Sequence, residues 1–243
     1  PRLAIPSPAA MNLLLPRLLC LLVALAACAA SPPPPAATAP SVGVAQADAP
    51  QLPVGRSPTR GRHDALVTAV LFGDLTSPDT ARAALALAHA RLEFGDNLRV
   101  VWKHRPGGDP DGCARTAAQV AEAVRAEREA EGFWRFVDAA LESGEACEVD
   151  ALVALAGRVG ASAERVRASL EDDAYAEAVA ADVDLGNRLD VTSAPALFIN
   201  GARVGGSTER LRAAVEQSLA AARAVTPATN AYARAVAAAF ARV

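Results

Sequence analysis

The chain has 243 residues, with 24 basic and 27 acidic side chains and a formal net charge of −3. The near-neutral charge and the scattered basic residues exclude a general nucleic-acid binder. The hydrophobic content of 52% rests largely on alanine, and the composition excludes a chain disordered throughout, a collagen and a multi-span membrane protein.

An export signal is the first pattern along the chain. Met11 is the only methionine, so residues 1–10 are expected to lie upstream of the true start. Arg17 then precedes an apolar run over residues 18–27. One positive charge followed by an apolar run too short to cross a bilayer is typical of a signal peptide.

The end of this run, residues 25–28 (Leu-Ala-Ala-Cys), resembles a bacterial lipoprotein signal. The resemblance implies cleavage before Cys28 and lipidation of Cys28, so that the lipid anchors the chain in a membrane. The next residue is Ala29 rather than Asp, which in a Gram-negative envelope implies the periplasmic face of the outer membrane. An ordinary secretory signal cut after Ala27 or Ala30 is the alternative.

Composition divides the chain into four parts. Residues 1–27 are the upstream residues and the signal peptide, and residues 28–50 are an Ala/Pro-rich tether expected to be disordered. Residues 51–222 are expected to form the folded domain. Residues 223–243 are rich in alanine and predict a C-terminal helix.

The folded part opens with a strand, a helix and a second strand. Residues 66–72 form an unbroken apolar run with β-branched side chains, which predicts a strand buried on both faces. Ser77 and Pro78 predict a helix start, with Ser77 as the N-cap and Pro78 at the first helical position. This helix continues over residues 81–94, and residues 98–102 predict the second strand.

Several helices are expected between Ala114 and Leu189, with breaks near Gly132, Gly144 and Gly160.

A hairpin and a closing helix follow. Residues 196–199 and 202–204 predict two short strands, and the Asn-Gly pair at 200–201 predicts the hairpin turn between them. Ser207 predicts the cap of a last helix, which places apolar side chains on one face at positions 211, 215 and 219.

This order of elements resembles the α/β thioredoxin fold with the inserted helical lobe of the DsbA-like family. Residues 72–80 (Phe-Gly-Asp-Leu-Thr-Ser-Pro-Asp-Thr) resemble the family segment Phe-x-Asp-x-x-Cys-Pro-x-Cys, and residues 191–201 (Val-Thr-Ser-Ala-Pro-Ala-Leu-Phe-Ile-Asn-Gly) resemble its cis-proline segment. Residues 101–106 (Val-Trp-Lys-His-Arg-Pro) resemble its second strand, and residues 51–55 (Gln-Leu-Pro-Val-Gly) its short first strand. The resemblance covers residues 51–222 and implies a helical insertion over about residues 112–189.

The same resemblance argues against the activity of the family. Ser77 and Thr80 stand at the positions of its two redox cysteines, and disulfide exchange proceeds through a mixed disulfide that a hydroxyl cannot form. No catalytic residue is therefore assigned, and the expected role of residues 77–80 is a well-formed helix start.

The resemblance also implies a place for a bound peptide. Pro195 corresponds to the cis-proline of the family, and the residue before it, Ala194, would offer its backbone to an extended peptide. The expected groove comprises Ser77, Pro78, Ala194 and Pro195.

The cysteines favour a structural bridge. Cys20 leaves with the signal and Cys28 carries the lipid, so Cys113 and Cys147 remain as a pair in an oxidising compartment. A structural disulfide is the expected arrangement, and a relocated redox pair is the alternative. The histidines, at positions 63, 89 and 104, are too far apart in sequence to suggest a metal site.

Three functions remain open. The first is a redox-inactive, lipid-anchored protein that binds an envelope protein or an unfolded peptide, with no cofactor and no nucleic acid. The second is a serine-dependent enzyme that resembles kappa-class glutathione transferases and hydroxychromene-carboxylate isomerases; there Ser77 would stabilise the thiolate of glutathione. The third is a structural envelope protein whose tail, residues 229–243, docks a partner.

Overall fold

A computed structural model describes residues 52–108, 112–144, 147–205 and 207–224. The signal, Cys28, the tether and residues 225–243 of the predicted C-terminal helix lie outside these ranges, and they stay predictions. None of the helices in the described ranges is both long enough and apolar enough to span a bilayer.

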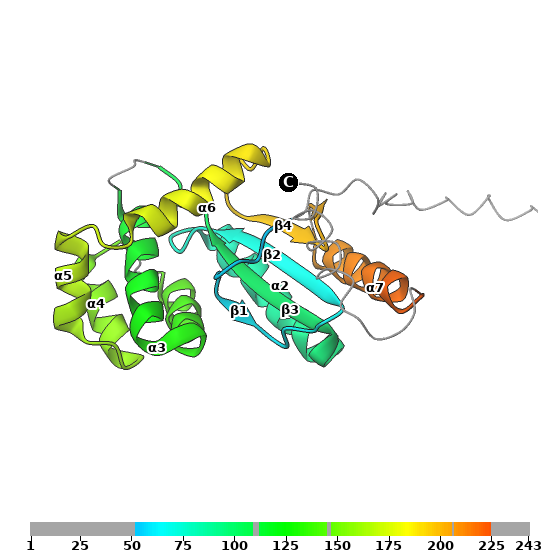
Figure 1. Cartoon of the computed structure of the whole chain (residues 1–243), viewed down its shortest axis with the longest axis horizontal. Helices are drawn as coiled ribbons and strands as arrows, with labels where there is room; N and C mark the ends of the chain where they lie inside the picture. The colour runs from blue at the N-terminus through cyan, green and yellow to red at the C-terminus, as the bar shows by residue number, and fades with distance from the viewer. Residues whose placement is uncertain (1–51, 109–111, 145–146, 206, 225–243) are drawn as a thin grey trace, which may run out of the picture. The chain divides into compact units, whose positions relative to one another are not determined.

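A five-stranded sheet in the order β1-β3-β2-β4-β5 forms the centre of the fold (Figure 1). Its strands are β1 (Thr59–Arg60), β2 (Val67–Gly73), β3 (Leu98–His104), β4 (Ala196–Ile199) and β5 (Ala202–Val204). Strands β2 and β3 are parallel, and the other pairs are antiparallel. The α/β thioredoxin fold with a helical insertion, expected from the order of elements, is the fold observed.

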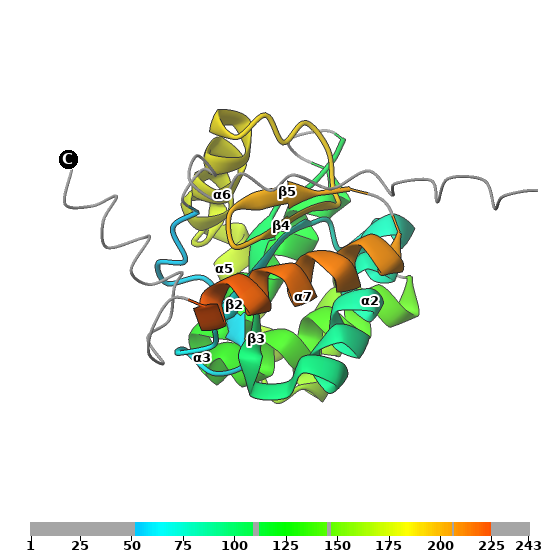
Figure 2. The same cartoon turned by 90° about the vertical axis from the view of Figure 1, so that its right-hand side faces the viewer.

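Helices cover both faces of the sheet and build a separate lobe. They are α2 (Pro78–Phe94), the short 3-10 helix η3 (Gly95–Asn97), α3 (Cys113–Ser143), α4 (Val149–Arg158), α5 (Ala163–Glu171), α6 (Ala176–Arg188) and α7 (Thr208–Ala224). Helices α2 and α7 lie side by side (Figure 2) and both contact the sheet. Helices α3, α4 and α5 form what we call the helical lobe. Helix α6 contacts β3, and the chain runs from α6 into β4 (Figure 1).

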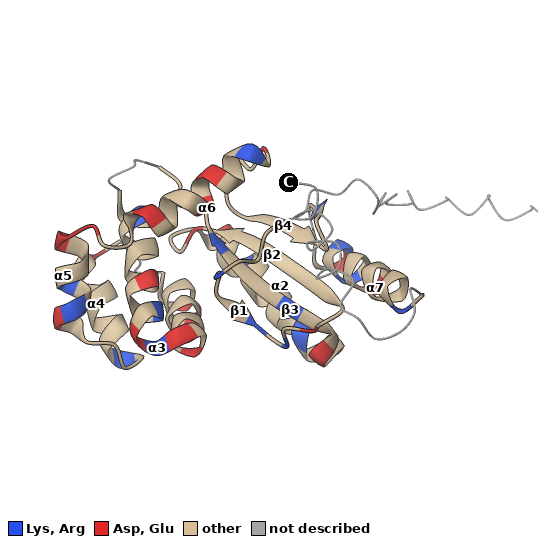
Figure 3. Ribbon diagram, viewed as in Figure 1, with Lys and Arg blue, Asp and Glu red and all other residues tan. Residues whose placement is uncertain are grey.

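The alternation of side chains along β2 explains the two hydrophobic layers. Val67, Ala69 and Leu71 are buried with α2, α7 and α3, whereas Val70 and Phe72 are buried with residues of α6 and β4 on the other face. Because both faces of β2 are covered, its sequence is continuously apolar. On the helical lobe, acidic and basic side chains are interspersed rather than segregated (Figure 3).

The prediction for the first strand is wrong. Residues 52–55 form no strand, and β1 is instead Thr59–Arg60, which pairs with Val101 and Val100 of β3. Leu52 has a different role, because its fully buried side chain packs against the layer that contains Val70 and Val101.

The predicted break near Gly132 is confirmed, but it falls three residues earlier, at Glu129. Helix α3 is interrupted at Glu129, which has φ 56° and ψ −160°, and it continues through Gly132. The side chain of Arg128 lies so close to the Cα of Gly132 that a Cβ there would collide with it. Gly132 therefore allows the side chain of Arg128 to pack closely against the helix beside the kink, and it does not end a helix.

The hairpin and the second strand agree with expectation. Asn200 and Gly201 both have positive φ angles, 46° and 88°, as a two-residue turn between β4 and β5 requires. Strand β3 extends two residues beyond its predicted end at Trp102, to His104.

Candidate functional site

The turn between β2 and α2 is held by the carboxylate of Asp74. Its Oδ1 accepts hydrogen bonds from the backbone N–H of Thr76 (2.8 Å) and from the hydroxyl of Thr76 (2.7 Å). Its Oδ2 accepts a bond of 2.8 Å from the backbone N–H of Gly107. A nearly buried carboxylate with three donors is well satisfied, and it ties the start of α2 to the loop after β3.

Ser77 and Thr80 both carry structural hydrogen bonds at this helix start. The Ser77 hydroxyl accepts a bond of 3.3 Å from the N–H of Thr80, as an N-cap does. Thr80 is fully buried, and its hydroxyl accepts a bond of 3.2 Å from the N–H of Asp74. The predicted helix start, with Ser77 as cap and Pro78 at the first position, is confirmed.

A pocket of about 500 Å³ lies beside this helix start. Ser77 and Ala194 both line it, together with Arg105, Arg115 and the loop residues Gly107 and Gly108. The Ala194–Pro195 peptide bond is cis.

The four expected groove residues are therefore only partly brought together. Ser77 and Ala194 share the pocket, whereas Pro195 lines a neighbouring pocket of about 130 Å³ with Leu197 and Leu211. Pro78 is exposed at the first helical position. Whether these residues bind a peptide stays a prediction.

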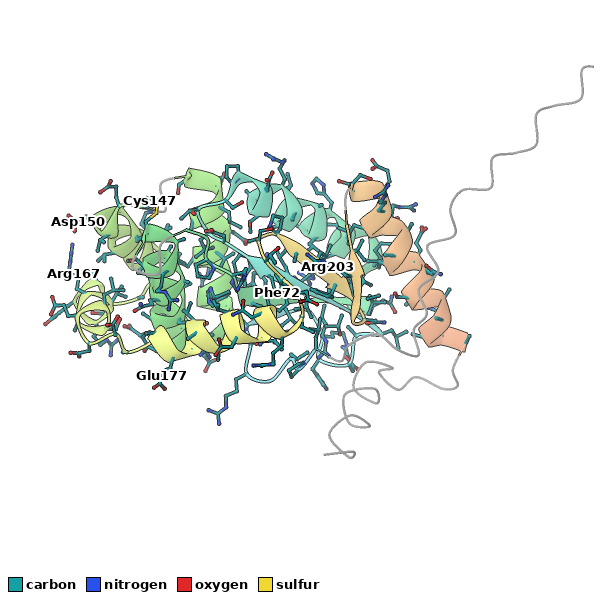
Figure 4. The ribbon with its side chains drawn as sticks, turned by 90° about the horizontal axis from the view of Figure 1, so that it is seen from above. Phe72, Cys147, Asp150, Arg167, Glu177 and Arg203 are labelled. Atoms are coloured by element: carbon teal, nitrogen blue, oxygen red, sulfur yellow. A yellow bond between two sulfur atoms is a disulfide. The ribbon has the colours of Figure 1, made fainter. Side chains whose placement is uncertain are left out.

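The lobe carries a covalent bond. Cys113 and Cys147, 34 residues apart in sequence, form a disulfide that joins the start of α3 to the segment before α4. Figure 4 labels Cys147 on this part of the lobe, near Asp150. The carboxylate of Asp150 forms an ion pair of 2.6 Å with Arg167, and this pair joins α4 to α5. The expected structural bridge is present in the structure.

A buried polar chain, which no sequence motif marks, connects β3 to α3. The indole N–H of Trp102 donates a bond of 3.1 Å to Nδ1 of His104, whose Nε2 lies 3.1 Å from Oε1 of Glu122. Because an indole nitrogen can only donate, Nδ1 of His104 must accept, so the ring hydrogen sits on Nε2 and is donated to Glu122. The polar pair Lys103–His104 at the end of an apolar strand was the one signal in the sequence.

Arg125 completes this chain. Its Nε donates a bond of 2.6 Å to Oε2 of Glu122, whose side chain is almost wholly buried. Burial raises the pKa of Glu122, but the interactions of its carboxylate with His104 and then with Arg125 together outweigh burial and hold the pKa below its usual value.

The neighbouring residue of β3, Lys103, pairs with α6. Its Nζ donates a bond of 2.8 Å to Oδ1 of Asp182, and Oδ2 of Asp182 accepts a bond of 2.9 Å from the backbone N–H of His104. These bonds fix the end of β3, immediately before Arg105. Among the described residues, no three His, Cys, Asp or Glu side chains gather as metal ligands would.

Comparison with known proteins agrees with this fold. Residues 106–217 match the model of a DSBA-like thioredoxin domain. The oxidised BdbD of Bacillus subtilis superposes with a TM-score of 0.61 at 20% identity, over 71% of this chain and 97% of that one. Wolbachia pipientis alpha-DsbA1 gives 0.62 at 15% identity, over 71% and 95%. These likenesses show the fold, the α/β thioredoxin-like fold with a helical insertion.

Curated relatives share only a part of their length with this chain. The Na⁺/H⁺ antiporter NhaA 1 of Salinispora arenicola is 34% identical over 147 residues, which are 60% of this chain and 22% of the antiporter. NhaA 3 of Salinispora tropica is 33% identical over 146 residues, again 22% of its length. The chain thus spans about a fifth of these relatives.

Proposed function

We propose that this chain is an exported, lipid-anchored DsbA-like protein that binds extended or unfolded peptide segments and exchanges no disulfide at Ser77 and Thr80. The observation that carries the proposal is the pocket lined by both Ser77 and Ala194, where a stretch of backbone faces the start of α2.

Peptide binding is supported by the backbone before β4. Thr192 and Ser193 are exposed and Ala194 is half-buried. Within the described ranges, no backbone hydrogen bond involves Ala194. Unpaired main-chain groups beside a sheet can take an extended peptide as an added strand, with neighbouring pockets selecting its side chains.

The absence of exchange is supported by the chemistry of residues 77 and 80. A thiolate at a helix N-terminus attacks a disulfide through a mixed disulfide, and neither hydroxyl can form that bond. Both hydroxyls already hold backbone N–H groups of the turn. The cysteines of the described lobe, Cys113 and Cys147, are joined to each other.

The proposed location is the bacterial envelope, at the periplasmic face of the outer membrane. Its basis is the signal that ends at Cys28, and a disulfide between Cys113 and Cys147 agrees with an oxidising compartment. Replacing Cys28 (Cys28→Ser) should abolish incorporation of a labelled fatty acid and release the protein from the membrane fraction. Retained label in that variant would contradict the anchor.

A serine-dependent glutathione transferase is a second candidate, favoured by one observation. The Ser77 hydroxyl lines the pocket and accepts a bond from Thr80, which leaves its own proton available to a thiolate. Glutathione conjugation that disappears in Ser77→Ala would establish this candidate in place of peptide binding.

The first experiment tests disulfide exchange. The oxidised chain should neither reduce insulin in the presence of a reductant nor refold a scrambled disulfide protein. The double variant S77C/T80C restores a dithiol at the helix start and should gain insulin reductase activity. Reduction of insulin by the unaltered chain at the rate of that variant would overturn the proposed inactivity.

The second experiment tests peptide binding by calorimetry. The probe is a short peptide of alternating Val and Thr with one central Gln. Ala194→Trp fills the pocket and should weaken saturable binding about tenfold or more, which corresponds to a loss of about 1.4 kcal/mol. Ala154→Trp, at an exposed position of α4, is the control and should bind as the parent does. Absent binding, or equal binding by both variants, would contradict the proposal.

A further inference from the structure

Two arginines from different elements meet at the pocket beside Ser77. Arg105 directly follows β3, and Arg115 lies in the first turn of α3. Both are half-buried and both line the cavity of about 500 Å³. The fold thus brings two guanidinium groups, ten residues apart in sequence, to one concave site.

The side chain of Arg115 has no partner among the described residues. Its Nε is buried without a hydrogen bond, and it forms no ion pair there. Arg125, on the same helix, instead pairs with Glu122 at 2.6 Å. A buried donor of a charged group without an acceptor is unfavourable unless something else supplies one.

The position of Arg115 in its helix is also unfavourable for a cation. The first turn of α3 contains no acidic residue, and the N-terminal end of a helix carries a partial positive charge. A guanidinium placed there adds to that charge. An anion in the pocket would be attracted both by the guanidinium of Arg115 and by the N-terminal end of α3.

Hydrogen bonds orient the guanidinium of Arg105, but no acidic partner among the described residues neutralises its charge. Its Nη1 donates to Oδ1 of Asn187 at 2.9 Å and to the carbonyl of Val183 at 3.4 Å, and both acceptors are uncharged. Asp74 is the acidic residue among those that line the pocket, and its two oxygens already accept bonds from Thr76 and Gly107. The described lining therefore presents more positive charge than it balances.

We propose that this pocket binds a carboxylate group, held by Arg105 and Arg115 beside the start of α2. Guanidinium groups bind carboxylates through paired, charge-assisted hydrogen bonds, which are stronger than neutral ones. The inference deepens the proposed function, on which it rests, because Ala194 lines the same pocket: the bound segment is an acidic one, with its Glu or Asp side chain in the pocket.

The experiment uses two peptides that differ in one atom group. One is the Val/Thr peptide with a central Gln, and the other has Glu in that place. Calorimetry with the parent chain should show the Glu peptide binding about tenfold tighter, as expected for a hydrogen bond to a charged group. The preference should decrease as salt is added, because screening weakens it.

Matched variants assign the preference to the pocket. Arg115→Gln breaks no hydrogen bond or ion pair of the described structure, and it should make the two peptides bind equally. Arg135→Gln removes the same charge from an exposed position of the same helix and should keep the preference. Circular dichroism of both variants should match that of the parent chain.

The outcomes separate this inference from the proposed function. Equal binding of both peptides to the parent chain overturns the carboxylate site and leaves peptide binding standing. Loss of preference in Arg135→Gln as well would also overturn the site, because it would show a general charge effect. Binding of neither peptide overturns the proposed function.

The last probe is glutarate, a small dicarboxylate that carries no peptide backbone. Glutarate that binds the parent chain but not Arg115→Gln supports the carboxylate site, and if both peptides fail it identifies a small acid as the ligand. Failure of glutarate and of both peptides overturns the site together with the function.

Discussion

The hydroxyl of Thr80 accepts a hydrogen bond of 3.2 Å from the backbone N–H of Asp74, and Thr80 is fully buried. Thr80→Val keeps the shape of the side chain but leaves that N–H without an acceptor. We expect it to lower the free energy of unfolding by about 1–3 kcal/mol, the cost of a buried unsatisfied group. Urea denaturation followed by circular dichroism measures the loss, and Thr80→Ser, which keeps the oxygen, should lose much less. A Val variant as stable as the parent chain would show that the bond contributes nothing.

The disulfide closes a loop of 34 residues between Cys113 and Cys147. In the chain-entropy model a loop of this length corresponds to about 3–4 kcal/mol of stability. The double variant C113S/C147S should therefore unfold at a clearly lower urea concentration than the oxidised chain. Mass spectrometry should show that Cys113 and Cys147 are alkylated only after reductant is added. Alkylation of both cysteines in the untreated protein would contradict the bridge.

Glu122 should make stability depend on pH in the acidic range. Its pKa is held below the usual value in the folded state, so its contribution to stability is present above the unfolded pKa and is lost as the pH falls through the folded one. Urea denaturation at a series of pH values should show Glu122→Gln less stable than the parent near neutral pH. The difference should shrink on acidification, and a difference that stays constant with pH would contradict this cause.

Replacing two helical glycines by alanine should change the free energy of unfolding in opposite directions. Gly132→Ala places a Cβ against the side chain of Arg128, so we expect a loss of about 1–3 kcal/mol from overpacking. At Gly157 of α4 nothing lies within 4 Å of an added Cβ, so Gly157→Ala should gain about 0.5–1 kcal/mol from helix propensity. Denaturation midpoints of the two variants measure both signs, and a stabilised Gly132→Ala would show that α3 relaxes around the kink.

Local signals predicted much of the fold because they act over a few residues. The apolar run of β2, the cap at Ser77 and the Asn200-Gly201 turn each depend on neighbours in the sequence, and each appears as expected. The pairing of Cys113 with Cys147 could be predicted only because the other cysteines had been assigned to the signal and the lipid.

The rest depends on contacts between distant segments. Strand β1 is too short to show a period, and it exists because β3 offers an edge at Val100 and Val101. The exact residue of the kink in α3, Glu129, could not be predicted because no Gly or Pro stands at that position. The pocket arginines carry no motif: only the packing of α3 beside the end of β3 brings Arg115 to the same cavity as Arg105 and Ser77.

The edge-to-face packing of aromatic rings between β3 and α3 has a practical consequence. The chain contains two tryptophans, and Trp102 and Trp134 lie with ring centroids 6.2 Å apart in perpendicular orientation, both buried. Intrinsic tryptophan fluorescence therefore reports on one place, the seam between the sheet and the helical lobe. A change in tryptophan fluorescence during titration or unfolding therefore reports the separation of α3 from β3. Fraying of α7 would leave the fluorescence unchanged.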